Sequence, residues 1–583
     1  MKWIYKLKMC GIAGIILFDN KKIQHKTITS IKNSLYHRGP DSNGHWLSED
    51  HSKLLINTRL SILDLSTDGN QPFYYSNKRF VIVYNGEIYN YQELKKNLSE
   101  YKFKSNTDTE VLLYMYHKYG AKFLDDLDGI FSIAIYDNKK KQLFCARDRY
   151  GVKPFYYIEN NNNFYFASEI KTLKMLNIIK NNVNLRAVSS YLTSEYYENT
   201  KYTFFKNIQK LKPGYYIKFN QDSFEEKKFT NFNKDFKKIS LPSKINDRQE
   251  MLYCLINRAV KKSMTSDVRC SIATSGGLDS SILQLLVKNN SKYNITGISF
   301  GFKEKKYSEE KFVKEIAKLS KLKIKFHILN SNFFFKALEK NIIINEEPFA
   351  GLPIMAYQEC INKINTHKVI LDGSGIDEMH FGYEKYLNKK YNIFNTAQDG
   401  TKAALDSLLL MKFLKNNKNY DFNAIELFDE NYKNRMYYDL FYIKLPRALR
   451  FRDKISMANS AELRPSFLDK DLINFFFNLD INDHYNKGSQ KYLLKKTFSE
   501  IYNSNFFYKN KRQVQTPMRE WFKKEFSNKI DNLIHKSLLW SYDIYDKKLF
   551  QKKTEEFFSG KINNAFFLWQ FINLDLWFKN NKF

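Results

Sequence analysis

Short hydrophobic runs separated by turn residues dominate the chain up to about residue 232. Residues 80–84 and 131–136, for example, are rich in β-branched and aromatic side chains and are followed by Asn or Asp. Runs of this length and composition predict strands. Helical periodicity appears in residues 30–36 and 109–118. The pattern therefore predicts stacked antiparallel sheets with a few helices.

After residue 248 short apolar runs alternate with amphipathic stretches. A helix to about residue 264 is expected to precede strands at 269–273, 295–300, 324–329 and 368–371, with helices from residue 280 and over 309–319. This alternation predicts a doubly wound parallel sheet. Long amphipathic helices dominate beyond residue 383 and end in the aromatic run 566–578, which we interpret as core packing.

A chain of 583 residues exceeds what one hydrophobic core usually serves. We expect two large domains, residues 10–232 and 248–583. The Lys-, Asn- and Ser-rich stretch 233–247 lacks β-like runs, so we interpret it as a linker. Residues 1–9 are interpreted as a short leader or a misassigned start.

The N-terminus superficially resembles a secretory signal, because lysines precede the apolar run 10–18. No small-residue cleavage site follows, and residues 19–22 have the composition of a turn. No stretch approaches the length needed to span a bilayer. The five cysteines show no CxxC or Cys/His spacing typical of zinc sites. We therefore expect a cytoplasmic protein with no membrane partner.

The formal net charge of +32 raises the question of a nucleic-acid partner. The lysines are spread along the chain, however, and the densest groups, 139–141 and 509–512, are short. This distribution indicates solvated surface lysines and no nucleic-acid partner.

Cys10 begins the run CGIAGII, and four further short motifs follow it along the chain. They are residues 37–41 (HRGPD), 59–62 (RLSI), 85–90 (NGEIYN) and 107–110 (TDTE). A lone Cys-Gly would more readily indicate a buried structural cysteine. The whole set resembles class-II glutamine amidotransferases, which use an N-terminal nucleophile. The resemblance implies an N-terminal-nucleophile sandwich, of α+β class, over residues 10–232.

The resemblance also implies a role for each matching residue. Cys10 would attack the glutamine side-chain amide, and Asn85 with the backbone NH of Gly86 would form the oxyanion hole. Arg59 would hold the substrate carboxylate, and Glu87 and Asp108 its amino group. These roles suit the chemistry, since Arg offers a bidentate fork to a carboxylate and preorganised donors stabilise a tetrahedral intermediate. For single residues, a helix cap at Asp108 or a turn at Gly86 stays an alternative.

A thiol needs a base, because a free thiol with a pKa of about 8.5 is mostly protonated at neutral pH. If Cys10 is the first residue, its own α-amino group titrates near about 7.7 to 8.0 and can take the proton. We therefore expect residues 1–9 to be absent from the active enzyme.

A second chemical motif, SGGLDSS at residues 275–281, lies between an expected strand and an expected helix. Glycines there let backbone NH groups approach a phosphate, and a helix N-terminus favours anions. Asp279 would be unfavourable beside an anion unless a cation such as Mg²⁺ lies between them. No Walker-type GxxxxGK[ST] run occurs, and the motif resembles the loop of enzymes that split ATP into AMP and pyrophosphate. The candidate ATP-binding residues are Ser275, Gly276, Gly277, Asp279, Ser280, Ser299 and Gly373.

A second acidic loop, residues 371–378, provides Asp377 as the other candidate Mg²⁺ ligand. With residues 452–457 and 462–464 and with Lys491, it makes the C-terminal half resemble that of glutamine-hydrolysing asparagine synthetases. This resemblance implies an α/β parallel-sheet ATP pyrophosphatase domain with a helical C-terminal part. In that family the Lys491 position is expected to stabilise charge as the acceptor displaces pyrophosphate, whereas the structural alternative is a solvated helix lysine.

The resemblance is imperfect in the second loop. Asparagine synthetases usually have SGEGSDE or SGEGGDE there, and this chain has Ser374 in place of the glutamate. The proline of residues 462–467 is shifted by one position, and residues 514–517 replace a segment richer in Gly and Phe. The acceptor carboxylate is therefore either aspartate, which we favour, or another acid such as a sugar acid.

The sequence thus predicts an ATP- and Mg²⁺-dependent amidotransferase that acts on small molecules: glutamine, ATP and a carboxylate. Relatives often pair, so a homodimer is one option that the resemblance offers. A basic nucleic-acid-binding protein with relic motifs is the rival from another class. A tRNA-modifying ATP pyrophosphatase would share the 275–281 loop but would not need the thiol domain.

Overall fold

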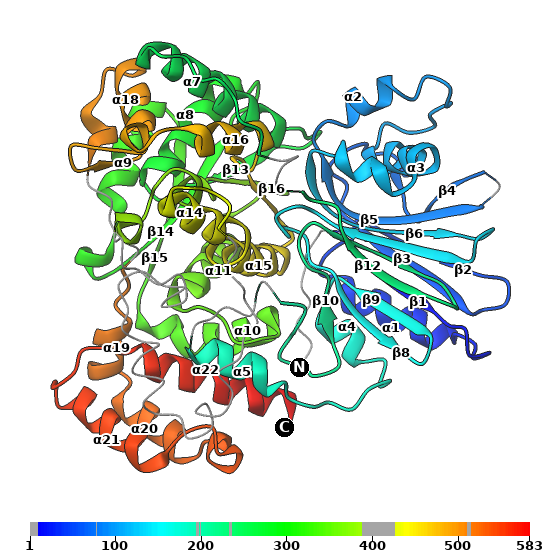
Figure 1. Cartoon of the computed structure of the whole chain (residues 1–583). Helices are drawn as coiled ribbons and strands as arrows, with labels where there is room; N and C mark the ends of the chain where they lie inside the picture. Colours follow the sequence, from blue (N-terminus) through cyan, green and yellow to red (C-terminus); the bar gives the residue numbers. More distant parts are fainter. Residues whose placement is uncertain are drawn as a thin grey trace.

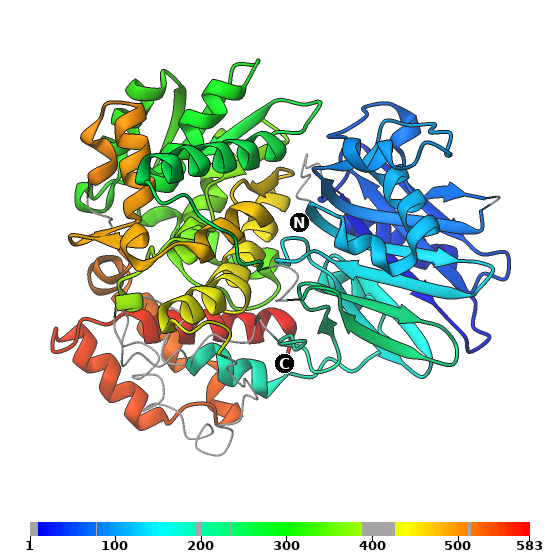
Figure 2. The ribbon, with the colours of Figure 1, turned by 45° about the horizontal axis from the view of Figure 1, so that its top comes forward.

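The computed structural model describes residues 10–76, 78–193, 198, 200–231, 236–387, 426–509 and 515–583. Figures 1 and 2 show an N-terminal part built of antiparallel strands beside a larger part in which helices surround a parallel sheet. The interpretation of residues 1–9 lies outside the described residues, as do residues 510–514 and residues 233–235 of the expected linker.

The N-terminal half contains two six-stranded sheets, and every pair of neighbouring strands in them is antiparallel. The first has the order β10-β8-β9-β1-β3-β2: β10 (Gln209–Lys210), β8 (Tyr156–Asn160), β9 (Asn163–Ala167), β1 (Gly11–Ile16), β3 (Lys53–Arg59) and β2 (Ser42–Leu47). The second has the order β12-β11-β7-β6-β5-β4: β12 (Phe224–Lys228), β11 (Tyr215–Phe219), β7 (Gln142–Arg147), β6 (Gly129–Asp137), β5 (Phe80–Ile88) and β4 (Phe73–Tyr75).

The sheets stack because their strands are apolar on both faces. In β5, Val81 and Val83 belong to a core shared with Ile12 and Ile16 of β1, between the two sheets. The alternate residues of β5 pack outward against α3 (Asp108–Tyr119). On the other sheet α1 (His25–Leu35) and α4 (Ile170–Lys174) cover the outer face. The predicted sandwich of antiparallel sheets is confirmed.

The second half is built on a five-stranded sheet with the order β15-β14-β13-β16-β17, parallel throughout. Its strands are β13 (Cys270–Ala273), β14 (Thr296–Phe302), β15 (Lys323–Leu329), β16 (Val369–Asp372) and β17 (Glu462–Pro465). The helices nearest the sites are α7 (Ile245–Ser263), α8 (Leu278–Asn290), α9 (Glu310–Ser320), α11 (Leu352–Ile364), α12 (Ile376–Met379), α15 (Lys444–Met457) and α18 (Tyr492–Ile501). The predicted parallel sheet is confirmed.

Helices fill the remainder of this half. They are α10 (Phe334–Asn345), α14 (Asn431–Phe441), α16 (Lys470–Asn478), α17 (Ile481–His484), α19 (Met518–Lys524), α20 (Ser527–His535), α21 (Lys547–Phe558) and α22 (Phe566–Asn581). The aromatic run predicted to be core forms α22, where Trp569 and Trp577 are fully buried. Beside it lies α5 (Leu185–Thr193) of the N-terminal half (Figure 1).

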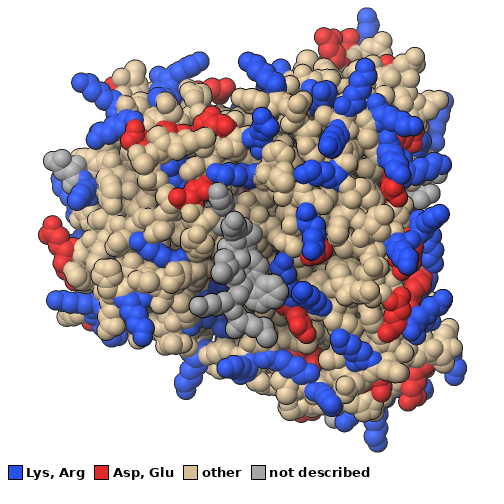
Figure 3. Space-filling view, turned by 180° about the vertical axis from the view of Figure 1, so that it is seen from behind, with Lys and Arg blue, Asp and Glu red and all other residues tan. Residues whose placement is uncertain are grey.

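Among the described residues, no helix is long and apolar enough to cross a membrane. Lys and Arg side chains are scattered over the face shown in Figure 3 and do not gather into one patch. This distribution agrees with the solvated surface lysines expected from the sequence.

Candidate active sites

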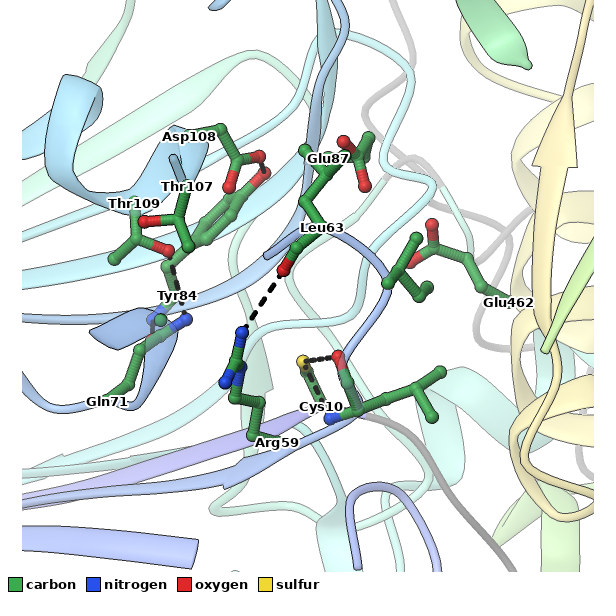
Figure 4. Close-up of a pocket in the computed structure, with 14 residues that line it drawn as sticks. Cys10, Arg59, Leu63, Gln71, Tyr84, Glu87, Thr107, Asp108, Thr109 and Glu462 are labelled. Carbon is green, nitrogen blue, oxygen red and sulfur yellow. Dashed lines mark hydrogen bonds between the residues drawn. The ribbon is translucent and has the colours of Figure 1, made fainter. Parts of the chain in front are cut away.

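Cys10 lies directly before β1 and lines a pocket together with the loop after β3 (Figure 4). Its Sγ accepts a hydrogen bond from the backbone NH of Leu60 at 3.3 Å and donates to the Leu60 carbonyl at 3.6 Å. The pocket is lined by Cys10, Arg59, Leu60, Ile62, Leu63, Gly69, Gln71, Tyr84, Gly86, Glu87, Thr107, Asp108, Thr109 and Glu462. Five of the six predicted glutaminase residues therefore lie around one cavity.

Burial raises the pKa of the Cys10 thiol to about 11, because the charged thiolate is poorly solvated there. At neutral pH the thiol is consequently protonated unless a nearby group removes its proton. Arg59 and Lys153 lower this pKa, whereas Glu462 raises it. The surroundings of Cys10 therefore do not activate the thiol by electrostatics alone.

Arg59 ends β3 and is almost completely buried. Its guanidinium donates hydrogen bonds to the carbonyls of Ser66 at 2.8 Å and Leu63 at 3.1 Å, and to Asn70 Oδ1 at 3.1 Å. These bonds fold the loop after β3 around the side chain. A loop wrapped in this way fixes one positive charge at the pocket wall.

Asn85 and Gly86 lie within β5, which runs four residues further than the hydrophobic run 80–84 suggested. Gly86 lines the pocket, and a Cβ at this position would lie 2.0 Å from the Ile130 carbonyl of β6, so only glycine fits. Asn85 is the predicted residue that does not line the pocket. Its buried Nδ2 has no hydrogen-bond partner within the described part of the chain, which leaves a donor for a ligand.

Two buried carboxylates face the same cavity. Asp108 Oδ2 accepts hydrogen bonds from Tyr84 Oη at 2.8 Å and from the Ile88 NH at 2.9 Å, and burial raises the pKa of Asp108 to about 6. Glu87 Oε2 accepts one from Arg464 Nη2 at 2.7 Å, whereas its Oε1 has no partner among the described residues. Burial raises the pKa of Glu87, and Arg464 opposes that rise.

The candidate ATP loop connects β13 to α8, as predicted, and α8 begins at Leu278, two residues earlier than expected. Gly276 has φ +74°, and a Cβ there would meet Phe312 of α9 at 2.7 Å, which explains the glycine. Ser275 Oγ and Ser280 Oγ lie 3.0 Å apart across the loop. Ser299 is buried in the adjacent strand β14.

The second acidic loop, between β16 and α12, meets the first. A Cβ on Gly373 would lie 3.2 Å from the backbone nitrogen of Ser280, so the glycine permits this close approach. Lys491, which directly precedes α18, joins the two loops. Its Nζ lies 2.6 Å from Asp279 Oδ1 and 2.6 Å from Asp377 Oδ1.

Both predicted Mg²⁺ ligands, Asp279 and Asp377, therefore pair with the ammonium group of Lys491. The two carboxylates raise the pKa of Lys491 and keep its amine charged. No group of three or more His, Cys, Asp and Glu side chains that could hold a metal occurs in the described ranges. Two carboxylates fit an ion that phosphate oxygens help to hold, and they do not form a complete metal site by themselves.

Ser374, at the departure from the usual loop, is buried and donates a hydrogen bond to Asp372 Oδ1. Arg452 Nη1 of α15 donates to the same oxygen at 2.5 Å. Asp372 thus places a carboxylate in this loop, two residues before the position where asparagine synthetases usually have glutamate. Arg452 neutralises its charge. The sequence reasoning singled out residues 452–457 but did not anticipate this contact.

Sequence reasoning also missed that Glu462 lines the thiol pocket from β17, across the boundary between the halves. The motif 462–464 was noticed, but a Glu and an Arg are not typical of a buried strand, so no strand was expected. Their burial is explained by the ion pairs they form. No local sequence signal indicates such partners far along the chain.

The sequence profile of the glutamine amidotransferase domain matches residues 9–230, and that of asparagine synthase matches residues 251–579. A putative glutamine-hydrolysing asparagine synthetase of Methanocaldococcus jannaschii is 35% identical over 65% of this chain and 76% of its own. Asparagine synthetase 1 of Bacillus subtilis is 27% identical over 98% of this chain and 97% of its own. The amidase chry2 of Gibberella zeae is 29% identical over 65% of this chain and 60% of its own.

Proposed function

We propose, since this chain belongs to the asparagine synthase family of glutamine-hydrolysing, ATP-dependent amidoligases, that it releases ammonia from glutamine at Cys10 and uses it to amidate an ATP-activated carboxylate. The observation that carries this proposal is the presence of two different sites in one chain. A thiol pocket lies in the antiparallel half, and two meeting loops with paired carboxylates lie in the parallel half.

In the first half-reaction the Cys10 sulfur attacks the side-chain amide carbon of glutamine, the carbon–nitrogen bond breaks to release ammonia, and water then hydrolyses the thioester to glutamate and the free thiol. The proposed base is the α-amino group of Cys10, freed by removal of residues 1–9, because burial leaves the thiol protonated. The unpartnered Nδ2 of Asn85 and the backbone NH of Gly86 are proposed to stabilise the oxyanion. Arg59 would pair with the substrate carboxylate, and Glu87 and Asp108 with its ammonium.

In the second half-reaction the loops after β13 and β16 are proposed to bind ATP. Ser275, Gly276, Gly277, Ser280, Ser299 and Gly373 are the binding candidates, because they lie on these loops or on the adjoining strand. Asp279 and Asp377 would hold Mg²⁺, which would neutralise phosphate charge when bound. Lys491 adds a fixed positive charge where pyrophosphate leaves as the acceptor is adenylated.

We favour aspartate as the acceptor, with asparagine, AMP and pyrophosphate as products. The alternative acceptor is another carboxylic acid, such as a sugar acid. We retain it because Ser374 stands in place of the usual glutamate and contacts Asp372, which pairs with Arg452. All these substrates are small molecules, and we place the reaction in the cytoplasm.

The experiment combines the protein with amide-¹⁵N-glutamine, ATP, Mg²⁺ and aspartate. The expected result is ¹⁵N-labelled asparagine with AMP and pyrophosphate in equal amounts. Release of glutamate without asparagine would favour another acceptor, which a panel of carboxylic acids, sugar acids included, would then identify. No glutamate release at all would refute the proposal.

A further inference from the structure

A buried ion pair joins the two halves of the molecule at the wall of the thiol pocket. Arg464 of β17 is fully buried, and its Nη2 donates to Glu87 Oε2 of β5 at 2.7 Å. Its Nε donates to Glu462 Oε1, also at 2.7 Å. Glu462 itself reaches the cavity from the other half (Figure 4). The pocket that holds the candidate nucleophile is therefore incomplete without β17.

A series of ion pairs and hydrogen bonds connects Glu462 with the candidate nucleophile Cys10. Lys153 Nζ lies 2.8 Å from the second oxygen of Glu462 and 4.0 Å from Asp453 Oδ1. Asp453 of α15 accepts from Arg38 at 3.1 Å, and Arg38 Nε donates to the Cys10 carbonyl at 3.2 Å. Residues of the ATP-dependent half thus contact Glu87 directly and are linked to Cys10 through Arg38.

One carboxylate at this wall is only half paired. Glu87, Asp108 and Glu462 line the cavity, and Arg59 lines it as well; Arg464 pairs with Oε2 of Glu87, and Lys153 pairs with Glu462. Burying an uncompensated charge is costly. Glu87 Oε1 has no partner in the described part of the chain, so it is the acceptor left for an incoming ammonium.

We propose that Arg464 of the ATP-dependent half is a positioning residue for glutamine hydrolysis, which holds Oε2 of Glu87 so that Oε1 receives the α-ammonium of glutamine. This inference rests on the proposed function and extends it, because it makes glutamine binding depend on β17. Glutamine affinity is thereby tied to the half of the protein that binds ATP.

The rival explanation is that Arg464 only secures its own half. Its Nη1 donates to the carbonyls of Ser263, the last residue of α7, at 3.1 Å and of Thr265, two residues further on, at 2.5 Å. Replacing Arg464 could therefore disturb ATP-dependent chemistry as well. The test must separate glutamine binding from the integrity of the second half.

The test compares Arg464→Gln and Arg464→Lys with the unaltered protein. Loss of a charge-assisted hydrogen bond to a buried carboxylate should raise KM for glutamine about tenfold or more in Arg464→Gln. The kcat of hydrolysis should change far less, and Arg464→Lys should recover part of the loss. Lys262→Gln is the matched control, because Lys262 also joins the halves, through Asp128 at 2.5 Å, but neither Asp128 nor its other partner Asp469 lines the pocket.

A double-mutant cycle with Glu87→Gln gives the readout that a purely structural role would not produce. If Arg464 acts through Glu87, adding Arg464→Gln to the Glu87→Gln variant should raise KM for glutamine little further. The pH profile gives a second readout, since Glu87 is faced by Arg464, Asp108, Glu462 and Lys153. Removing the guanidinium should move the acid limb of glutamine binding to higher pH.

An unchanged KM in Arg464→Gln, or fully additive effects in the cycle, would overturn the inference while leaving the proposed function intact. If Arg464→Gln also loses synthesis from ammonium salt, the Arg464→Lys variant decides by the same criteria. Absence of glutamine hydrolysis in the unaltered protein would instead refute the proposed function.

Discussion

The Cys10 thiol is held between two backbone groups of Leu60 and surrounded by buried polar side chains. These contacts orient the sulfur, but burial keeps its pKa near 11. A dedicated base is therefore needed, and a terminal α-amine on the same residue is the one that the chemistry favours.

We predict that the active protein begins at Cys10. Intact-mass measurement of purified, glutamine-hydrolysing material should show a chain without residues 1–9. A form engineered to keep Met9 should hydrolyse glutamine at least about a hundredfold more slowly. In that form the α-nitrogen of Cys10 is part of a peptide bond and cannot act as the base. Full hydrolysis by a chain that starts at Met1 would contradict the proposed base.

Asp108 gives a prediction for pH. Its pKa is raised to about 6, so it loses its charge as the pH falls through that value. Glutamine affinity should therefore weaken below about pH 6 and be retained above it. The measurement is calorimetric binding of glutamine to Cys10→Ala, which removes the thiol from the titration.

Asp108→Asn in the same background should bind glutamine weakly across this range. ATP affinity, measured in parallel, serves as the control, because Asp108 lies in the other half. Equal glutamine affinity at pH 5 and pH 8 would contradict a carboxylate role in binding the ammonium.

The elements that carry the second site are the loops after β13 and β16, which are adjacent strands of the parallel sheet. Because the carboxyl ends of parallel strands lie at one edge, loops far apart in sequence come together there. Gly276 and Gly373 allow that contact, and Lys491 before α18 joins the two carboxylates.

Lys491→Met should lower synthesis from ammonium salt by about 10²–10³-fold, as expected when one preorganised charge is removed. Glutamine hydrolysis should persist. Lys496→Met is the control, since Lys496 lies on α18, which Lys491 directly precedes, and its amine pairs with Glu500. Normal synthesis by Lys491→Met would show that the lysine does not stabilise the reaction.

The elements also show what a sequence can predict here. Strand β1 and the β13–loop–α8 unit were predictable because apolar runs and glycine-rich turns are local signals. Strand β17 was not, because the burial of its Glu462 and Arg464 depends on ion pairs with each other and with residues far away in the sequence, Lys153 and Glu87. The contact of Asp372 with Arg452 also escaped prediction, because the two residues are far apart in the sequence although both lie in the second half.

The whole molecule is held together by packing that crosses the expected domain boundary. One core cluster includes Ile15 of β1 and Phe571 of α22, and another includes Leu60 together with Leu283 of α8. The halves therefore share hydrophobic core, and the division at residues 233–247 stays a prediction. Close packing of the halves would suit the proposed transfer of ammonia from one half to the other.

The most direct test of this two-site mechanism is Cys10→Ala, assayed with either glutamine or ammonium salt as the nitrogen source. The mechanism predicts that glutamine no longer supports amide formation, whereas ammonium, ATP and Mg²⁺ still do, at a rate near that of the unaltered protein. Loss of both activities, or continued use of glutamine, would contradict it.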